Sequence, residues 1–87
     1  MKELNFEIKN GVGLHARPAG VLATSAKSFK CEITVKCGGK EANAKRLLSL
    51  MSLGAVRGST LHFTFDGVDE ETAHEKIGEV LNEQLGK

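Results

Sequence analysis

Aromatic side chains are scarce in this sequence, which has no tryptophan, no tyrosine and four phenylalanines. Three of the phenylalanines fall at alternating positions of predicted strands, where they face a core, so a platform for stacked bases is not expected. Twelve lysines and arginines against eleven acids leave a net charge of +1, which gives no general attraction to nucleic acid or anionic membranes. No apolar run approaches the roughly 20 residues of a membrane span. The composition is otherwise typical of a soluble globular domain.

Cysteine is limited to Cys31 and Cys37. If these two cysteines lie at the two ends of one strand, they are about 20 Å apart at ~3.3 Å per residue, which is too far for a disulfide bond. No C-x-x-C pair is present, so neither a zinc site nor a thiol redox site is expected. Two packed, reduced thiols fit a reducing compartment, and residues 1–5 lack the apolar stretch of a signal peptide. We therefore expect a cytoplasmic protein.

The length predicts one domain spanning residues 1–87, because a chain of this size buries roughly two-thirds of its unfolded surface in one modest core. Alternation of apolar and polar residues predicts strands over 3–8, 31–37 and 60–65. A short strand at 40–43 follows the hairpin turn at Gly38-Gly39.

Helical spacing of apolar residues predicts three helices. The first runs from Ala16 to about Lys27 and has Pro18 in its first turn, where a missing N–H costs nothing. A short helix over 47–53 is ended by Gly54, and the last runs from about 69 to 85. The order is β-α-β-β-α-β-α with one polar face on each strand. We expect an α+β fold, an open-faced β-sandwich whose antiparallel or mixed sheet carries all helices on one face.

A single histidine begins the first predicted helix, within the segment Gly11-Val-Gly-Leu-His-Ala-Arg-Pro-Ala19. The first turn of a helix exposes unpaired N–H groups and the positive end of the macrodipole, so it stabilises an anion. Ala16 and Arg17 can offer backbone N–H groups, and the Arg17 guanidinium matches phosphate oxygens. Pro18 fixes the turn, and the glycines before His15 allow close approach of the backbone. These residues predict a site for a phosphoryl group.

The positive end of the same helix macrodipole disfavours a positively charged imidazolium. We therefore expect His15 to be neutral and nucleophilic near pH 7. A phosphoryl group on one ring nitrogen would meet donors already in place, and phosphoryl transfer needs mainly positioning and charge stabilisation. In the plain alternative, His15 only caps the helix and Arg17 is a solvated charge. That alternative leaves the surrounding glycines and Pro18 unexplained, so we favour a phosphoryl relay on His15.

The stretch Gly13-Leu-His-Ala-Arg-Pro-Ala19 resembles the active-site signature of HPr, the histidine-containing phosphocarrier of the bacterial phosphoenolpyruvate:sugar phosphotransferase system. Residues 50–54, Leu-Met-Ser-Leu-Gly, followed by Gly58, resemble the second signature of that family, and length and element order agree. The resemblance implies that His15 accepts a phosphoryl group at Nδ1 from enzyme I and passes it to sugar-specific IIA proteins or domains. It further implies that Arg17 binds the phosphate, that Pro18 shapes the loop, and that three helices cover a four-stranded antiparallel sheet.

Apolar residues of the short helix span roughly 220° of the helical wheel, about twice what packing on a sheet requires. We expect residues 50 and 53 to face the core, and Leu47, Leu48 and Met51 to form an exposed patch suited to several partners. In the family, this helix joins the histidine loop in docking enzyme I and IIA. Another part of the chain could cover the patch instead, although so short a chain has little left to do so.

Position 46 departs from the commonest pattern of the family, in which a serine is the target of a regulatory kinase. Arg46 cannot be phosphorylated, so that regulation is not expected. Lys45 and Arg46 with Arg17 form a possible basic rim for acidic partners, or are solvated charges of no consequence. Ser49 and Ser52 lie on the polar stripe of the helix, and nothing marks them as modification sites.

No metal site and no cofactor are expected, because His62 and His74 have no acids or cysteines at ligand spacing around them. Two other functions stay open: a regulatory binding module of the same fold, and a carrier of a nitrogen-related or fructose-specific branch. The resemblance associates such regulators with loss of the active histidine, which is present here. An independent enzyme is least expected, and nothing suggests more than a monomer.

Overall fold

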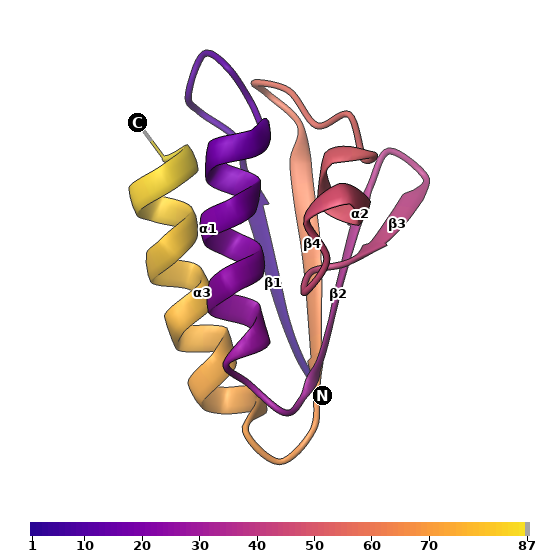
Figure 1. Cartoon of the computed structure of the whole chain (residues 1–87), viewed down its shortest axis with the longest axis vertical. Coiled ribbons are helices and arrows are strands. Elements are labelled where there is room, and N and C mark those ends of the chain that lie inside the picture. The colour runs from indigo at the N-terminus through magenta and orange to yellow at the C-terminus, as the bar shows by residue number, and fades with distance from the viewer. Residues whose placement is uncertain (87) are drawn as a thin grey trace.

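Strands and helices follow one another in the predicted order in the computed structural model, which describes residues 1–86 (Figure 1). The elements are β1 (Lys2–Glu7), α1 (Ala16–Lys27), β2 (Glu32–Cys37), β3 (Lys40–Asn43), α2 (Leu47–Met51), β4 (Thr60–Asp66) and α3 (Glu70–Leu85). All neighbouring strands pair antiparallel in the order β1-β4-β2-β3. The sheet is therefore antiparallel and not mixed, and the open-faced α+β sandwich is confirmed.

The core lies between one face of the sheet and the helices, with α1 packed beside α3 and α2, α3 against β1 and β4, and α2 beside β3 (Figure 1). Inward residues of β4 and β2 are fully or almost fully buried, among them Phe63, Phe65, Ile33 and Val35. The predicted inward stripes of α1 and α3 are also buried. The opposite face of the sheet carries the polar residues of every strand, as the alternation predicts. Within residues 1–86, no helix has the length and apolar character needed to cross a membrane.

The α2 helix is shorter than predicted, because its regular turns end at Met51 and not at Leu53. Beyond Met51 the chain tightens: the Leu53 N–H donates to the Leu50 carbonyl at 3.2 Å, an i to i−3 contact. Gly54 then takes φ +64°, a conformation that glycine adopts without strain. Leu53 remains buried all the same, so the predicted inward face is right although the helix boundary is wrong.

The Asp69 carboxylate, which sequence patterning places only at the start of the last helix, fastens that helix to the segment before β2. Its two oxygens accept the backbone N–H groups of Lys30 at 2.7 Å and Cys31 at 2.8 Å. The amide of Lys30, and after it that of Cys31, hold the pKa of Asp69 below its ordinary range. These bonds join residues 38 and 39 positions apart and close the end of the sandwich opposite the His15 loop.

Cys31, whose backbone N–H takes part in these bonds, has a buried side chain, as expected for a packed thiol. Burial, and then the hydrogen bond with Asp69, raise the pKa of the Cys31 thiol to about 11. A thiol in this state is a poor nucleophile, because the thiolate is the reactive form. Both cysteines are free, and Cys37 is half-buried.

The Asp69 contacts predict an acid-sensitive contribution to stability. Because the folded state lowers the pKa of Asp69, its carboxylate stabilises the fold above the ordinary aspartate pKa, and this contribution is lost as pH falls below about 4. We expect Asp69→Asn to lower the free energy of unfolding at pH 7, and the difference from wild type to shrink toward pH 3. Urea denaturation at both pH values measures it. Asp66→Asn is the matched control, because the Asp66 side chain is exposed and makes no hydrogen bond or ion pair with the rest of residues 1–86; an equal loss in both variants contradicts the prediction.

Candidate functional site

His15 is the N-cap residue of α1, with extended backbone angles of φ −97° and ψ −171°. Its carbonyl accepts the first intrahelical bond, from the Ala19 N–H at 3.0 Å. Its imidazole makes no capping hydrogen bond and is exposed to solvent. His15 thus occupies the N-cap position through its backbone, while its ring is not used as the capping group.

The first turn of α1 provides the donors expected around this ring. Ala16 and Arg17 are its first two residues, whose N–H groups have no intrahelical acceptor, and Pro18 is buried in the same turn. Arg17 is exposed and has no ion pair within residues 1–86. No acid occupies the first turn of α1. The positive end of the helix is thus left uncompensated for an incoming anion.

The loop before His15 is held against the segment that follows α2. The Leu14 N–H donates to the Ala55 carbonyl at 3.0 Å, and Leu14 is buried. Gly13 has φ +73°, and a Cβ at this position would lie 2.6 Å from the Ala55 oxygen and 2.8 Å from the Val56 Cα. Gly13 is therefore required for the close approach of this loop to residues 55 and 56. Gly11 is not, because a Cβ at that position would meet nothing within 4 Å.

The outward residues of α2 form the expected apolar patch. Leu48 is 79% exposed, Leu47 39% and Met51 38%, and Leu50 beneath them is fully buried. Leu48 is thus largely open to solvent, whereas Leu47 and Met51 are each covered in part by their neighbours. Val56 is another exposed apolar residue, at 60%, and its Cα lies close to Gly13 in the loop before His15. Sequence reasoning did not single it out, because only the fold brings residues 13 and 56 together.

The predicted basic rim needs a correction at Lys45. Its ammonium donates to the Phe29 carbonyl at 2.7 Å, beyond the C-terminal end of α1. Arg17 lies at the other end of this 12-residue helix, roughly 18 Å away at 1.5 Å per residue. Lys45 is therefore held at the wrong end to join Arg17 in a rim. Arg46, the exposed N-cap residue of α2, remains available.

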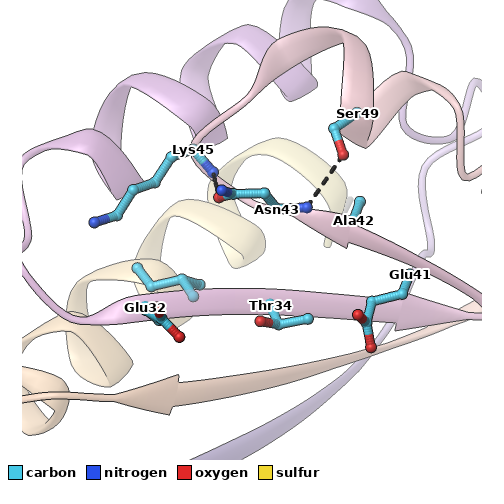
Figure 2. A pocket seen from close by; sticks show the side chains of 8 residues that line it. Glu32, Thr34, Glu41, Ala42, Asn43, Lys45 and Ser49 are labelled. Carbon is cyan, nitrogen blue, oxygen red and sulfur yellow. Dashed lines mark hydrogen bonds between the residues drawn. The ribbon is translucent and has the colours of Figure 1, made fainter.

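A polar groove lies between β2, β3 and the start of α2, and none of the residues that line it belongs to α1 or to the His15 loop (Figure 2). Figure 2 shows the Lys45 side chain extending away from Ser49 along this groove. The Asn43 N–H, on the free edge of β3, donates to the Ser49 hydroxyl at 3.1 Å. The Ser52 hydroxyl donates to the Ser49 carbonyl at 2.6 Å. Both serines thus have local structural partners. No group of three potential metal ligands occurs within residues 1–86.

An open-faced sandwich with an uncommitted histidine at a helix N-terminus defines the class of small phosphoryl-carrying domains. The family model described as "PTS HPr component phosphorylation site" matches residues 2–83. This chain therefore belongs to the HPr family.

Individual relatives and solved structures of the same family also match this chain. The phosphocarrier protein HPr of Mycoplasma genitalium is 45% identical over 74 residues, which are 84% of each protein. A Mycoplasma histidine-containing phosphocarrier structure matches with a TM-score of 0.94 at 30% identity, covering 99% of this chain and 100% of that one. The multiphosphoryl transfer protein of Vibrio cholerae is 40% identical over 94% of this chain, which spans only 21% of that longer protein.

The contact of Gly13 with Ala55 predicts the effect of a methyl group. We expect Gly13→Ala to lower the free energy of unfolding by about 1–2 kcal/mol from the positive φ alone, with a further loss from the clash. Gly11→Ala, where the added carbon has open space, should change it by less than about 0.5 kcal/mol. Urea denaturation compares the two variants, and equal effects would show that loop docking does not depend on Gly13.

Proposed function

We propose that the Nδ1 atom of His15 accepts a phosphoryl group from phosphorylated enzyme I, charged by phosphoenolpyruvate, and donates it to IIA proteins or domains for sugar uptake. The observation that carries this proposal is the exposed imidazole without an intramolecular partner, set at the start of a helix. A neutral ring nitrogen offers a lone pair to phosphorus, and attack forms the N–P bond as the donor's bond to phosphorus breaks. The donor group keeps the electrons of the broken bond.

Arg17 and the N–H groups of Ala16 and Arg17 would hold the phosphoryl oxygens, because they are unpaired and close in sequence to the ring. Pro18 would stiffen the turn that presents them. A phosphorylated side chain carries close to two negative charges at pH 7, and the uncompensated helix end favours such an anion. No cofactor is needed, since these residues only position the group and disperse its charge.

The partner surface that we propose consists of Leu47, Leu48 and Met51 with Arg46 beside them. The net charge of +1 conceals a strong separation of charge. Segments 8–31 and 42–65, which include α1, α2 and the loops around His15, contain no acid at all. They contain these lysines and arginines: Lys9, Arg17, Lys27, Lys30, Lys45, Arg46 and Arg57. Of these, Lys27, Lys30 and Lys45 lie toward the C-terminal end of α1, and the others remain for the surroundings of the patch. An apolar centre with positive surroundings fits partners whose docking faces carry carboxylates.

We further propose that residues 1–87 act as a single monomeric domain in the cytoplasm. Two alternatives stay in view. A regulatory binding module would dock the same partners without carrying phosphate, but it would have no use for a free histidine at this position. A carrier for a nitrogen-related or fructose-specific branch would use the same chemistry, and the match to a domain-sized part of multiphosphoryl transfer proteins keeps this branch assignment open.

Phosphorylation of His15 predicts a specific chemical signature. Incubation with enzyme I and labelled phosphoenolpyruvate should give a label on the protein that is lost in acid and survives alkali. The label should be absent from His15→Ala. A folded wild-type protein that takes no label would contradict the carrier and favour the binding module. Transfer of the label to IIA proteins of different branches, compared by kcat/KM, identifies the branch.

Docking through α2 predicts that Leu48→Ser raises the KM for phosphorylation by enzyme I. Loss of one central apolar side chain from an interface costs about 1–2 kcal/mol, or roughly 5- to 30-fold in kcat/KM. Val68→Ser is a matched control, because Val68 is also apolar and 93% exposed but lies in the loop before α3. It should leave KM unchanged. Equal KM values for wild type and both variants would exclude Leu48 from the interface.

A further inference from the structure

The loop before α1 contains a pair of residues that the proposed phosphoryl chemistry does not use, Asn10 followed by Gly11. The chain is anchored on either side of the segment that follows Asn10. The Asn10 N–H donates to the Leu85 carbonyl at 3.2 Å, and the next backbone anchor is the hydrogen bond of Leu14. Between these anchors, the N–H groups of residues 11–13 donate to no acceptor within residues 1–86. The segment therefore keeps backbone freedom inside the folded protein.

The side chain of Asn10 is held only weakly. It makes one long hydrogen bond, from Nδ2 to the Gly13 carbonyl at 3.5 Å, and its Oδ1 atom has no partner within residues 1–86. Turning the amide over does not improve this, because the Gly13 carbonyl accepts hydrogen bonds and has none to donate. In either orientation, one polar atom of the amide lacks a partner, so hydrogen bonding does little to fix this group.

Gly11 provides a backbone nitrogen that is free to approach this side chain. The residue is exposed, and a Cβ at this position would meet nothing within 4 Å, so no neighbouring atom restricts it. Glycine has no side chain to hinder attack by its own nitrogen, and it reaches backbone conformations that are closed to other residues. Attack of the Gly11 nitrogen on the side-chain carbonyl carbon of Asn10 closes a succinimide ring.

Asp66 and Gly67 form a similar pair, in which the structure opposes the same ring closure. The Gly67 N–H donates to the Glu70 carboxylate at 3.2 Å, so its nitrogen is occupied. A Cβ on Gly67 would lie 2.6 Å from the Cα of Cys31, which shows how closely this backbone is packed. The other asparagines lie in strands or in α3 and are followed by residues with side chains. Asn10 is therefore the position that the fold leaves open to this reaction.

We propose that Asn10 is a site of spontaneous deamidation in the folded protein, and that this modification weakens phosphoryl transfer to His15. The Gly11 nitrogen gives up its proton and bonds to the Asn10 Cγ atom, the bond from Cγ to Nδ2 breaks, and ammonia leaves with that proton. Water then adds to either carbonyl of the succinimide and opens the ring. The product is aspartate, or isoaspartate, in which the main chain runs through the former side chain. Water is consumed and ammonia is released, and no oxidant, reductant or enzyme takes part.

Both products place a carboxylate in a part of the surface that has none. Segment 8–31 contains no acid, and the uncompensated start of α1 is the feature that favours a phosphoryl anion. A carboxylate in this loop repels that anion and also the carboxylates proposed for the docking faces of partners. Isoaspartate in addition lengthens the main chain by one carbon before the Leu14 contact. This functional part of the inference rests on the proposed function, whereas the deamidation itself does not.

Incubation of the folded protein at pH 6 and pH 8, followed by ion-exchange chromatography and peptide mass mapping, tests the modification. We expect a more acidic form to accumulate in wild type, with aspartate and isoaspartate at position 10. It should form faster at pH 8, because the attacking nitrogen must lose its proton. Gly11→Ala is the matched variant, since its added carbon has open space in the fold and hinders only the attack. The acidic form should be lost from this variant, and Asn82 and Asp66 should stay unmodified in both proteins.

Two results of this incubation would overturn the proposal. One is a wild-type protein that stays unmodified at position 10 at both pH values. The other is equal accumulation of the acidic form in wild type and Gly11→Ala, because the reaction would then not depend on the free approach of the Gly11 nitrogen.

The rate of phosphoryl transfer from enzyme I tests the functional part. The purified acidic form should have its kcat/KM lowered by about two- to five-fold at low salt, the range of a single charge interaction at an exposed site. Asn10→Asp supplies the charge without the extra main-chain carbon, so it should show a loss in the same range that added salt removes. Asn82→Asp makes the same charge change on α3 and should leave kcat/KM unchanged.

The outcomes separate this inference from the proposed function. Equal kcat/KM values for the acidic form and for fresh protein would overturn the functional part. Fresh protein that takes no label would contradict the proposed function and with it the functional part, but accumulation of the acidic form would still establish the deamidation.

Discussion

The hydrogen bond from the Leu14 N–H to the Ala55 carbonyl joins the two segments on which the proposed function depends. It places the histidine loop beside the segment that leaves α2, and Gly13 allows the backbones to approach within a distance that no other residue could accept without displacement. Because Leu14 and Ala55 are both buried, the contact is part of the core and is not a surface association. The loop that carries His15 is thereby held against the segment that follows α2, although residues 15 and 55 are far apart in the sequence.

The two long helices show why the start of α1 is suited to an anion. In α3, Glu70 and Glu71 lie in the first turn and Asp69 precedes it, so acids of the chain itself compensate the positive helix end. In α1, the first turn holds no acid, and His15 at the N-cap gives no capping bond. A helix end without an internal partner costs stability. An incoming phosphoryl group would supply the missing acceptor, so the feature that weakens the free protein is the one that the proposed reaction uses.

Local pattern was sufficient to predict the element order, the buried stripes and the position of His15, since each depends on residues a few positions apart. It failed where contacts join distant segments. The true partner of Lys45 is a carbonyl beyond the end of α1, and the partners of Asp69 lie before β2. Both side chains look like ordinary surface charges until the fold brings those backbones to them. Likewise, Gly11 and Gly13 are equivalent in the sequence, and only the approach of Ala55 separates them.

The α2 helix could not persist as a surface element on its own, because five residues are far below the length at which a helix is stable in water. The protein holds it from three sides. Leu50 is fully buried beneath it, the Ser49 hydroxyl accepts the Asn43 N–H on the edge of β3, and the Lys45 side chain just before it reaches the Phe29 carbonyl. These attachments keep the outward leucines in a fixed arrangement. A partner that docks there meets a surface already ordered, so little conformational entropy is lost on association. A small, rigid patch of this kind is compatible with the brief encounters that the proposed carrier function requires.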